Sequence, residues 1–133
     1  MTEKVRVEQF DILGEDERGK TARFSLPRQQ ADFIYLTRRA GSVSGNTYHL
    51  GKNPGTNPKV FVLLSGELAF SYRHIDEATH ETITVSAPAN IIVSPKVAHR
   101  VEAVTDIVIL ECNSIDNIRS DRHQADVIQE VTS

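Results

Sequence analysis

Two stretches decide the fold, Gly45-Asn46-Thr47-Tyr48-His49 and Lys59-Val60-Phe61-Val62-Leu63-Leu64-Ser65-Gly66. The first is typical of a strand that ends in a histidine, and the second of an apolar strand that ends on Ser-Gly. The loop between them is rich in glycine, proline and asparagine, which favour turns. The pattern predicts two short strands joined by an irregular loop.

A third stretch, Ile91-Ile92-Val93-Ser94-Pro95-Lys96-Val97-Ala98-His99, repeats this arrangement. It consists of an apolar run, a proline turn and a histidine that opens a new strand. His49 and His99 therefore each stand at the end of a predicted strand. Small β-barrels collect such positions around one pocket, so we expect both imidazoles to line the same cavity.

The rest of the chain also alternates between short apolar segments and turn residues. Further strands are predicted over 5–13, 21–26, 32–38, 59–65, 68–73, 82–85, 91–93, 99–104 and 106–112. This regular spacing is typical of a β-sandwich or barrel. After Asn113 the sequence becomes polar, and the run Gln124–Val131 suits either a short amphipathic helix or a loose tail.

The motifs resemble the two-part signature of the cupins, which reads roughly G-x5-H-x-H-x(3,4)-E-x6-G and then G-x5-P-x-G-x2-H-x3-N. Thr47 and His49 stand at the H-x-H pair, and Lys59 stands at the position of the glutamate. His99 matches the histidine of the second motif. The sequence is most similar to cupins of surface-polysaccharide and nucleotide-sugar biosynthesis: the epimerase-like C-terminal domain of capsular polysaccharide enzymes, and the dTDP-sugar ketoisomerases.

This resemblance covers about residues 14–117 and implies an all-β fold, a single antiparallel cupin jelly-roll barrel. We expect residues 1–13 to form an N-terminal strand, a candidate for pairing two chains. Residues 118–133 would form a C-terminal tail that is helical in part. Small cupins commonly pair, and pairing covers exposed strand edges, so a homodimer is expected.

Composition narrows the class of protein. The 133 residues suit one domain, and 15 basic against 18 acidic residues give a formal net charge of −3. No basic run points to a nucleic-acid or membrane partner. A single cysteine, Cys112, leaves no internal disulfide and fits a reducing compartment. No apolar window suits a signal peptide or membrane span, so a cytoplasmic protein is predicted.

A cupin metal site needs about four nitrogen or oxygen ligands, usually three imidazoles and a carboxylate. Here Thr47 replaces one imidazole, and Lys59 replaces the carboxylate with an ammonium group that has no lone pair to offer a cation. His49 and His99 remain as metal ligands, an incomplete set. We expect no required cofactor, with binding of a divalent metal as the less favoured alternative.

The resemblance implies proton transfer on a keto sugar linked to a nucleotide, without metal. A carbonyl group acidifies the adjacent C–H, so a neutral imidazole suits the base and a phenol the acid. His49 is the candidate base or acid, with His99 and Tyr35 assisting. The candidate ligand-binding residues are Thr47, Lys59, Arg38 and Arg100, since guanidinium groups suit diphosphate oxygens.

Structural interpretations stay open for the same residues. A lone buried histidine is more often satisfied by hydrogen bonds than used in chemistry, and Tyr35 suits a strand core. Lys59 suits a buried ion pair or an anion ligand equally, and a solvated strand face is the default for the arginines. A non-catalytic cupin that binds a sugar or anion, and a metal-dependent cupin enzyme, are the alternative functions.

Overall fold

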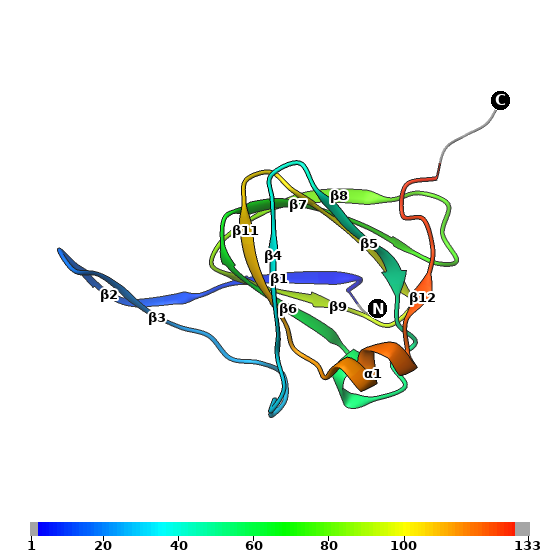
Figure 1. Ribbon diagram of the computed structural model, residues 1–133, viewed down its shortest axis with the longest axis horizontal. Helices are drawn as coiled ribbons and strands as arrows, with labels where there is room; N and C mark the ends of the chain where they lie inside the picture. The colour runs from blue at the N-terminus through cyan, green and yellow to red at the C-terminus, as the bar shows by residue number, and fades with distance from the viewer. Residues whose placement is uncertain (1–2, 130–133) are drawn as a thin grey trace.

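The computed structural model describes residues 3–129, most of which form antiparallel strands packed as two facing sheets (Figure 1). One five-stranded sheet has the order β1 (Val5–Gln9), β9 (Ala89–Val93), β6 (Lys59–Ser65), β11 (Ile107–Glu111), β4 (Ile34–Arg38). The other has the order β12 (His123–Gln124), β5 (Val43–Tyr48), β10 (Val97–Ala103), β7 (Glu67–His74), β8 (Glu81–Ser86). This architecture confirms the predicted all-β, single-domain cupin jelly roll.

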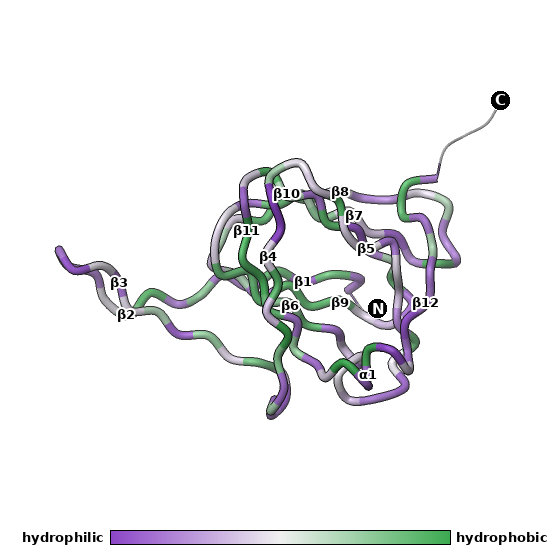
Figure 2. Tube along the Cα trace, in the orientation of Figure 1, coloured by the Kyte–Doolittle hydropathy of each residue, from purple (hydrophilic) through white to green (hydrophobic). Residues whose placement is uncertain are grey.

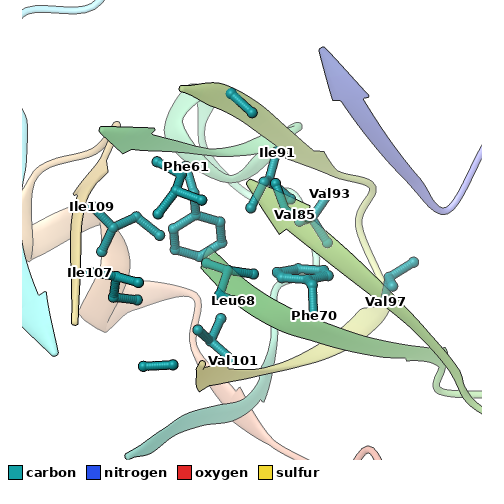
Figure 3. Close-up of a cluster of buried hydrophobic side chains, with 13 residues drawn as sticks. Phe61, Leu68, Phe70, Val85, Ile91, Val93, Val97, Val101, Ile107 and Ile109 are labelled. Carbon is teal, nitrogen blue, oxygen red and sulfur yellow. The ribbon is translucent and has the colours of Figure 1, made fainter. Parts of the chain in front are cut away.

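The interior of the barrel is filled by apolar side chains from both sheets (Figure 3). Strand alternation places every second residue of each strand inward, so Phe61 and Leu63 of β6 face Leu68 and Phe70 of β7. Val60 and Val62 point to the opposite face of β6, where Phe10, Leu26 and Cys112 cover them. This second layer explains why the sequence of β6 is apolar on both faces.

A separate hairpin of β2 (Asp11–Asp16) and β3 (Gly19–Arg23) projects from the barrel (Figure 1). The strand predicted over residues 5–13 is therefore wrong in its extent: β1 ends at Gln9, pairs with β9 and gives way to the hairpin. Most of the hairpin is exposed, and its tip is hydrophilic (Figure 2). Apolar and polar residues alternate in the hairpin although neither of its faces is buried. The alternation therefore could not show where β1 ends and β2 begins.

Two segments outside the barrel strands, the loop between β5 and β6 and the chain after β11, lie against one end of the barrel. The 3₁₀ turn η1 (Pro54–Thr56) and the helix α1 (Ile115–Ser120) lie there, and β12 pairs with β5. Ser114 caps the start of α1 by accepting a hydrogen bond from the Asn117 amide. Residues 124–129 form no helix, so of the two alternatives for Gln124–Val131 the helix is not observed as far as 129. Residues 130–131 lie outside the described residues.

Among residues 3–129, no helix has the length and apolar character needed to cross a membrane. Cys112 is a buried free thiol beneath the β6 layer, where it serves as a small packing residue.

Candidate functional site

A cavity of about 200 Å³ opens into the barrel interior between the two sheets. Both sheets and the C-terminal segment contribute to its walls. The lining residues are Leu36, Arg38, Ser44, Gly45, Thr47, His49, Phe61, His99, Val101, Ile107, Ile109, Glu111, Ile118 and Arg122. Its volume lies below the roughly 300–1,000 Å³ of pockets that enclose drug-sized ligands. The cavity therefore suits a group of about the size of one sugar ring.

The close approach of β5 to β10 brings Thr47 beside His99. Gly45 makes this approach possible, because it has a φ of +104° and a Cβ there would lie 2.7 Å from the His99 carbonyl oxygen. The pairing register shifts between His99 and Arg100, as in a β-bulge. Gly45 of the first motif therefore allows Thr47 and His99 to lie side by side in one wall of the cavity.

His49 follows the last residue of β5 and is almost completely buried. Its Nδ1 lies 2.5 Å from the backbone carbonyl oxygen of Asp121. Because a carbonyl oxygen can only accept a hydrogen bond, Nδ1 donates and Nε2 keeps its lone pair. Burial lowers the pKa of His49, and the positive charge of Lys59 lowers it further. The ring is therefore neutral at pH 7.

His99 enters the cavity from β10, and its ring centroid lies 5.7 Å from that of His49. Phe61 meets its edge and Phe70 stacks on it, with centroids at 5.4 and 6.0 Å. Its Nδ1 lies 3.3 Å from the carbonyl oxygen of Val97, so Nδ1 is again the donor. Burial, with a smaller effect of His49, lowers the pKa of His99 to about 3. His99 is a neutral, mostly apolar-packed imidazole.

Lys59 lies inside the barrel and is only 2% exposed. Its Nζ lies 3.0 Å from Oε2 of Glu111, a residue that lines the cavity. Burial lowers the pKa of Lys59, whereas the Glu111 carboxylate opposes that shift. Of the interpretations left open by the sequence, the buried ion pair is the one observed. Glu111 is the cavity-facing member of this pair, and the sequence analysis did not single it out.

Arginine side chains lie on two walls of the cavity. Arg38 of β4 donates from Nε to Ser44 Oγ at 2.9 Å, and Arg122 follows α1 and is exposed. Arg122 was not predicted, because nothing local in the polar C-terminal sequence marks it. Its place depends on the docking of that segment against β5.

Two predicted site residues lie elsewhere. Tyr35 is 65% exposed on the outer face of β4, where its neighbour Leu36 faces the cavity instead. Arg100 lies between His99 and Val101, both of which line the cavity, so alternation turns Arg100 to the outer face of β10. The positions expected for Tyr35 and Arg100 therefore need correction, since neither side chain lines the cavity within this chain.

A metal ion does not fit the side chains around the cavity. The residues described, 3–129, contain no cluster of three or more His, Cys, Asp or Glu side chains arranged to hold one. His49 and His99 supply two imidazoles, while the Lys59 ammonium engages the nearby carboxylate of Glu111. A divalent cation would have to compete with that ammonium group, so no step is assigned to a metal.

The arrangement combines a neutral imidazole, apolar walls and guanidinium groups. His49 can accept a proton at Nε2, and Leu36, Ile107 and Ile109 give the same cavity an apolar wall. Arg38 and Arg122, which line the same cavity, can bind an anionic group. This is chemistry suited to a small ring that carries a phosphate-containing substituent.

Known proteins resemble this chain in their structure. No protein-family model matches the sequence. No curated protein sequence matches it either. The sugar 3,4-ketoisomerase QdtA from Thermoanaerobacterium thermosaccharolyticum, crystallised with TDP, superposes with a TM-score of 0.70 at 16% identity over 93% of this chain and 90% of its own.

Two further solved structures are similar. The 3′-monoepimerase ChmJ from Streptomyces bikiniensis, in complex with dTDP-quinovose, has a TM-score of 0.70 at 14% identity, covering 92% of this chain and 69% of its own. The capsular polysaccharide assembling protein CapF from Staphylococcus aureus has a TM-score of 0.61 at 21% identity, covering 89% of this chain and 34% of its own. Likeness at these identities concerns the fold, and the fold of this chain is the cupin jelly roll it shares with sugar ketoisomerases and epimerases.

Proposed function

We propose that the chain is an isomerase or epimerase that moves a proton on a keto sugar linked to a nucleotide. The observation that carries the proposal is His49, a buried neutral imidazole that lines a ring-sized cavity, with Nδ1 held by a carbonyl oxygen and Nε2 in no hydrogen bond to residues 3–129. Solved structures of similar fold are named as a sugar 3,4-ketoisomerase and a 3′-monoepimerase, and both were crystallised with TDP-type ligands. Fold analogy supports the substrate class, and the site supports the chemistry.

In the proposed reaction His49 Nε2 removes the proton from the carbon next to the keto group. The carbonyl oxygen takes up a proton from solvent, which the later loss of the hydroxyl proton returns, and an enediol forms. Return of a proton to the former carbonyl carbon, with loss of the neighbouring hydroxyl proton, moves the keto group by one position. The sugar keeps its composition throughout, so the reaction needs no oxidant or reductant. Return of the proton to the original carbon from the opposite face would give epimerisation instead.

The remaining cavity residues would hold the sugar. Thr47 and the Nε2 lone pair of His99 suit hydrogen bonds to sugar hydroxyls, and Glu111 can accept one while Lys59 balances its charge. Arg38 and Arg122 suit the diphosphate, because a guanidinium fork matches phosphate oxygens. Tyr35 and Arg100 have no part in the proposed proton transfer, since their side chains lie outside the cavity.

The experiment is incubation in D₂O with TDP-4-keto-6-deoxyglucose, the ligand bound to a variant of QdtA in a solved structure. Proton NMR should show deuterium entering the carbon next to the keto group, and a second keto sugar should accumulate. His49→Asn should lower the rate by roughly 10²–10⁴-fold, the range of general-base catalysis. His80→Asn, at an exposed loop residue, is the matched control and should retain the rate.

A non-catalytic sugar-binding cupin is the second candidate, and one observation favours it. Thr47 stands where the resembled family has a further histidine, and Tyr35 lies on the outer face, so that no tyrosine of the described residues lines the cavity. This function predicts that TDP binds, as measured by calorimetry, while the bound keto sugar exchanges no proton with D₂O. Binding without exchange would select it over the isomerase.

A homodimer and a cytoplasmic location belong to the same proposal. An isolated two-stranded hairpin is marginally stable in water, yet β2 and β3 form a sheet of their own and leave Leu13 62% exposed. Ile12, Phe24, Phe33 and Tyr35 are also exposed. Burial of these side chains against a second copy would stabilise the hairpin. Sedimentation equilibrium should give a dimer that Leu13→Glu converts to monomer; a monomeric wild type would refute the pairing.

A further inference from the structure

Asp121, the residue that caps the C-terminal end of α1, is fully buried, and its carboxylate makes four hydrogen-bond contacts. Its Oδ1 accepts the backbone N–H of Leu50, and its Oδ2 accepts that of Lys52, each at 2.9 Å. The hydroxyl of Thr56 donates to Oδ2 at 2.8 Å, and His123 Nε2 lies 3.2 Å from Oδ1. The carboxylate thus fastens the loop that directly follows His49.

Electrostatics favour the ionised form of this carboxyl group. Burial alone would raise the pKa of Asp121, but the hydrogen bonds from Leu50, Lys52, Thr56 and His123 outweigh burial and hold the pKa below its usual value. A carboxylate that accepts several hydrogen bonds at once cannot be replaced by an amide, which has one acceptor oxygen and two donor hydrogens.

The backbone of the same residue contacts the imidazole itself. The carbonyl oxygen of Asp121 accepts the hydrogen bond from His49 Nδ1. The Asp121 carboxylate therefore holds the backbone at Leu50 and Lys52, while the Asp121 carbonyl oxygen holds the His49 ring. Together these contacts fix the position of the carbonyl relative to His49. In free histidine the neutral ring carries its proton mainly on Nε2, whereas this contact requires the proton on Nδ1.

We propose that Asp121 is a positioning residue that fixes His49 in the tautomer with its proton on Nδ1 and its lone pair on Nε2. The catalytic meaning of that tautomer rests on the proposed function, because only Nε2 is left to take a proton from a ligand. The tautomer itself is a property of the folded chain and can be measured without any ligand.

The neighbouring residues are held by contacts that do not involve the Asp121 carboxylate. Gln124 of β12 pairs with Thr47 of β5, and Ala125 N–H donates to the Asn46 carbonyl oxygen at 3.0 Å. The Arg73 guanidinium donates to the carbonyl oxygens of Asp126 and Val127 at 2.7 and 3.2 Å. Replacement of the carboxylate should therefore loosen the carbonyl beside His49 and leave the rest of the segment docked.

The test is long-range ¹H–¹⁵N correlation NMR of protein labelled at its histidines, with the His49 signals assigned through His49→Asn. Wild type should carry the proton on Nδ1. Asp121→Asn should shift His49 toward the Nε2–H form, so that this form becomes the major population. Asp126→Asn is the matched control, because Asp126 is exposed on the same segment, and it should keep the wild-type signals.

A wild-type ring protonated on Nε2 would overturn the proposal without any variant. So would an Asp121→Asn protein that folds and keeps the wild-type tautomer. If that variant does not fold, Thr56→Val removes one donor to the same carboxylate, and a smaller shift toward Nε2–H is expected; no shift would overturn the proposal. A wild-type Nδ1–H signal without turnover would reject the isomerase and leave the positioning role standing.

Discussion

The barrel interior contains two contrasting regions, one packed with apolar side chains and one with buried polar groups beside a cavity. In the packed region, Leu68, Phe70, Val85, Ile91, Val93 and Val97 fill the space between the sheets and are at most 1% exposed. In the polar region, His49, His99 and Glu111 line a cavity, and Lys59 pairs with Glu111 behind it. His99 stands at the boundary, with Phe61 and Phe70 against its ring.

The difference shows which part of the fold is built for stability. Apolar side chains stabilise the barrel simply by being buried. A buried ammonium group or a buried neutral imidazole destabilises it unless the group has a hydrogen-bond or ion-pair partner. Both regions lie on the same strands: β6 carries Lys59 at its start and Leu63 further along. Retention of buried polar groups at one side of a packed core is typical of functional sites.

The packed region should give the largest loss of stability. Phe70→Ala removes a fully buried ring and leaves a cavity, so the free energy of unfolding should fall by about 3–5 kcal/mol. Urea denaturation followed by circular dichroism measures the change. The exposed Val104 supplies the control, since Val104→Ala should lose much less. Equal losses for the two variants would contradict the assignment of the packed region.

The buried ion pair should give the next largest effect. Lys59→Met keeps the aliphatic stem but leaves the Glu111 carboxylate unpaired, which should cost up to about 3 kcal/mol, because Glu111 is partly exposed and water can reach it. The double variant Lys59→Met with Glu111→Gln should recover most of the loss in the same denaturation assay. A double variant as unstable as the single one would show that the pair contributes little.

The pH dependence of stability should give the smallest effect. Folding lowers the pKa of His99 to about 3, so between that value and the ordinary pKa of 6.5 the unfolded chain binds the extra proton. Stability should therefore fall as pH is lowered from 6.5, by about 1.4 kcal/mol for each pH unit from this group.

His99→Asn isolates this contribution, because the amide can donate to the Val97 carbonyl oxygen but does not titrate. The difference in slope between wild type and His99→Asn from pH 4.5 to 6.5, measured by urea denaturation, is the predicted quantity. His80→Asn should leave the slope unchanged, since that side chain is exposed in the folded chain too. Equal slopes in wild type and His99→Asn would show that burial does not hold this ring neutral.

Much of the polar region could be predicted from sequence spacing. The two motifs brought His49, Thr47 and His99 to one cavity, as expected from strands that end at its mouth. Tyr35 was misplaced because Phe33-Ile34-Tyr35-Leu36 is apolar throughout and gives no alternation from which to fix the phase. Alternation could have excluded Arg100, which directly follows His99. It could also have found Glu111, which continues the inward series Ile107, Ile109.

The C-terminal contribution could not be predicted. Asp121 and Arg122 lie in polar sequence without periodicity, and their contacts join residues about 70 positions apart, as between Asp121 and Leu50. Pairing of this kind depends on how the C-terminal segment docks against the barrel, and no local signal encodes it. The extent of the exposed hairpin could not be predicted for a related reason: its apolar residues face no core within the chain.

The most direct measurement is the mapping of TDP binding onto the two regions by ¹H–¹⁵N correlation spectra of the assigned protein. The changes in chemical shift should concentrate on the amides of Arg38, Thr47, His49, His99 and Arg122, while Val85, Ile91 and Val93 in the packed region should not move. Arg122→Ala should weaken binding and leave the map centred on the same cavity. Shifts centred on the hairpin or the packed region, or no shifts at millimolar TDP, would contradict a nucleotide-sugar site in the polar region.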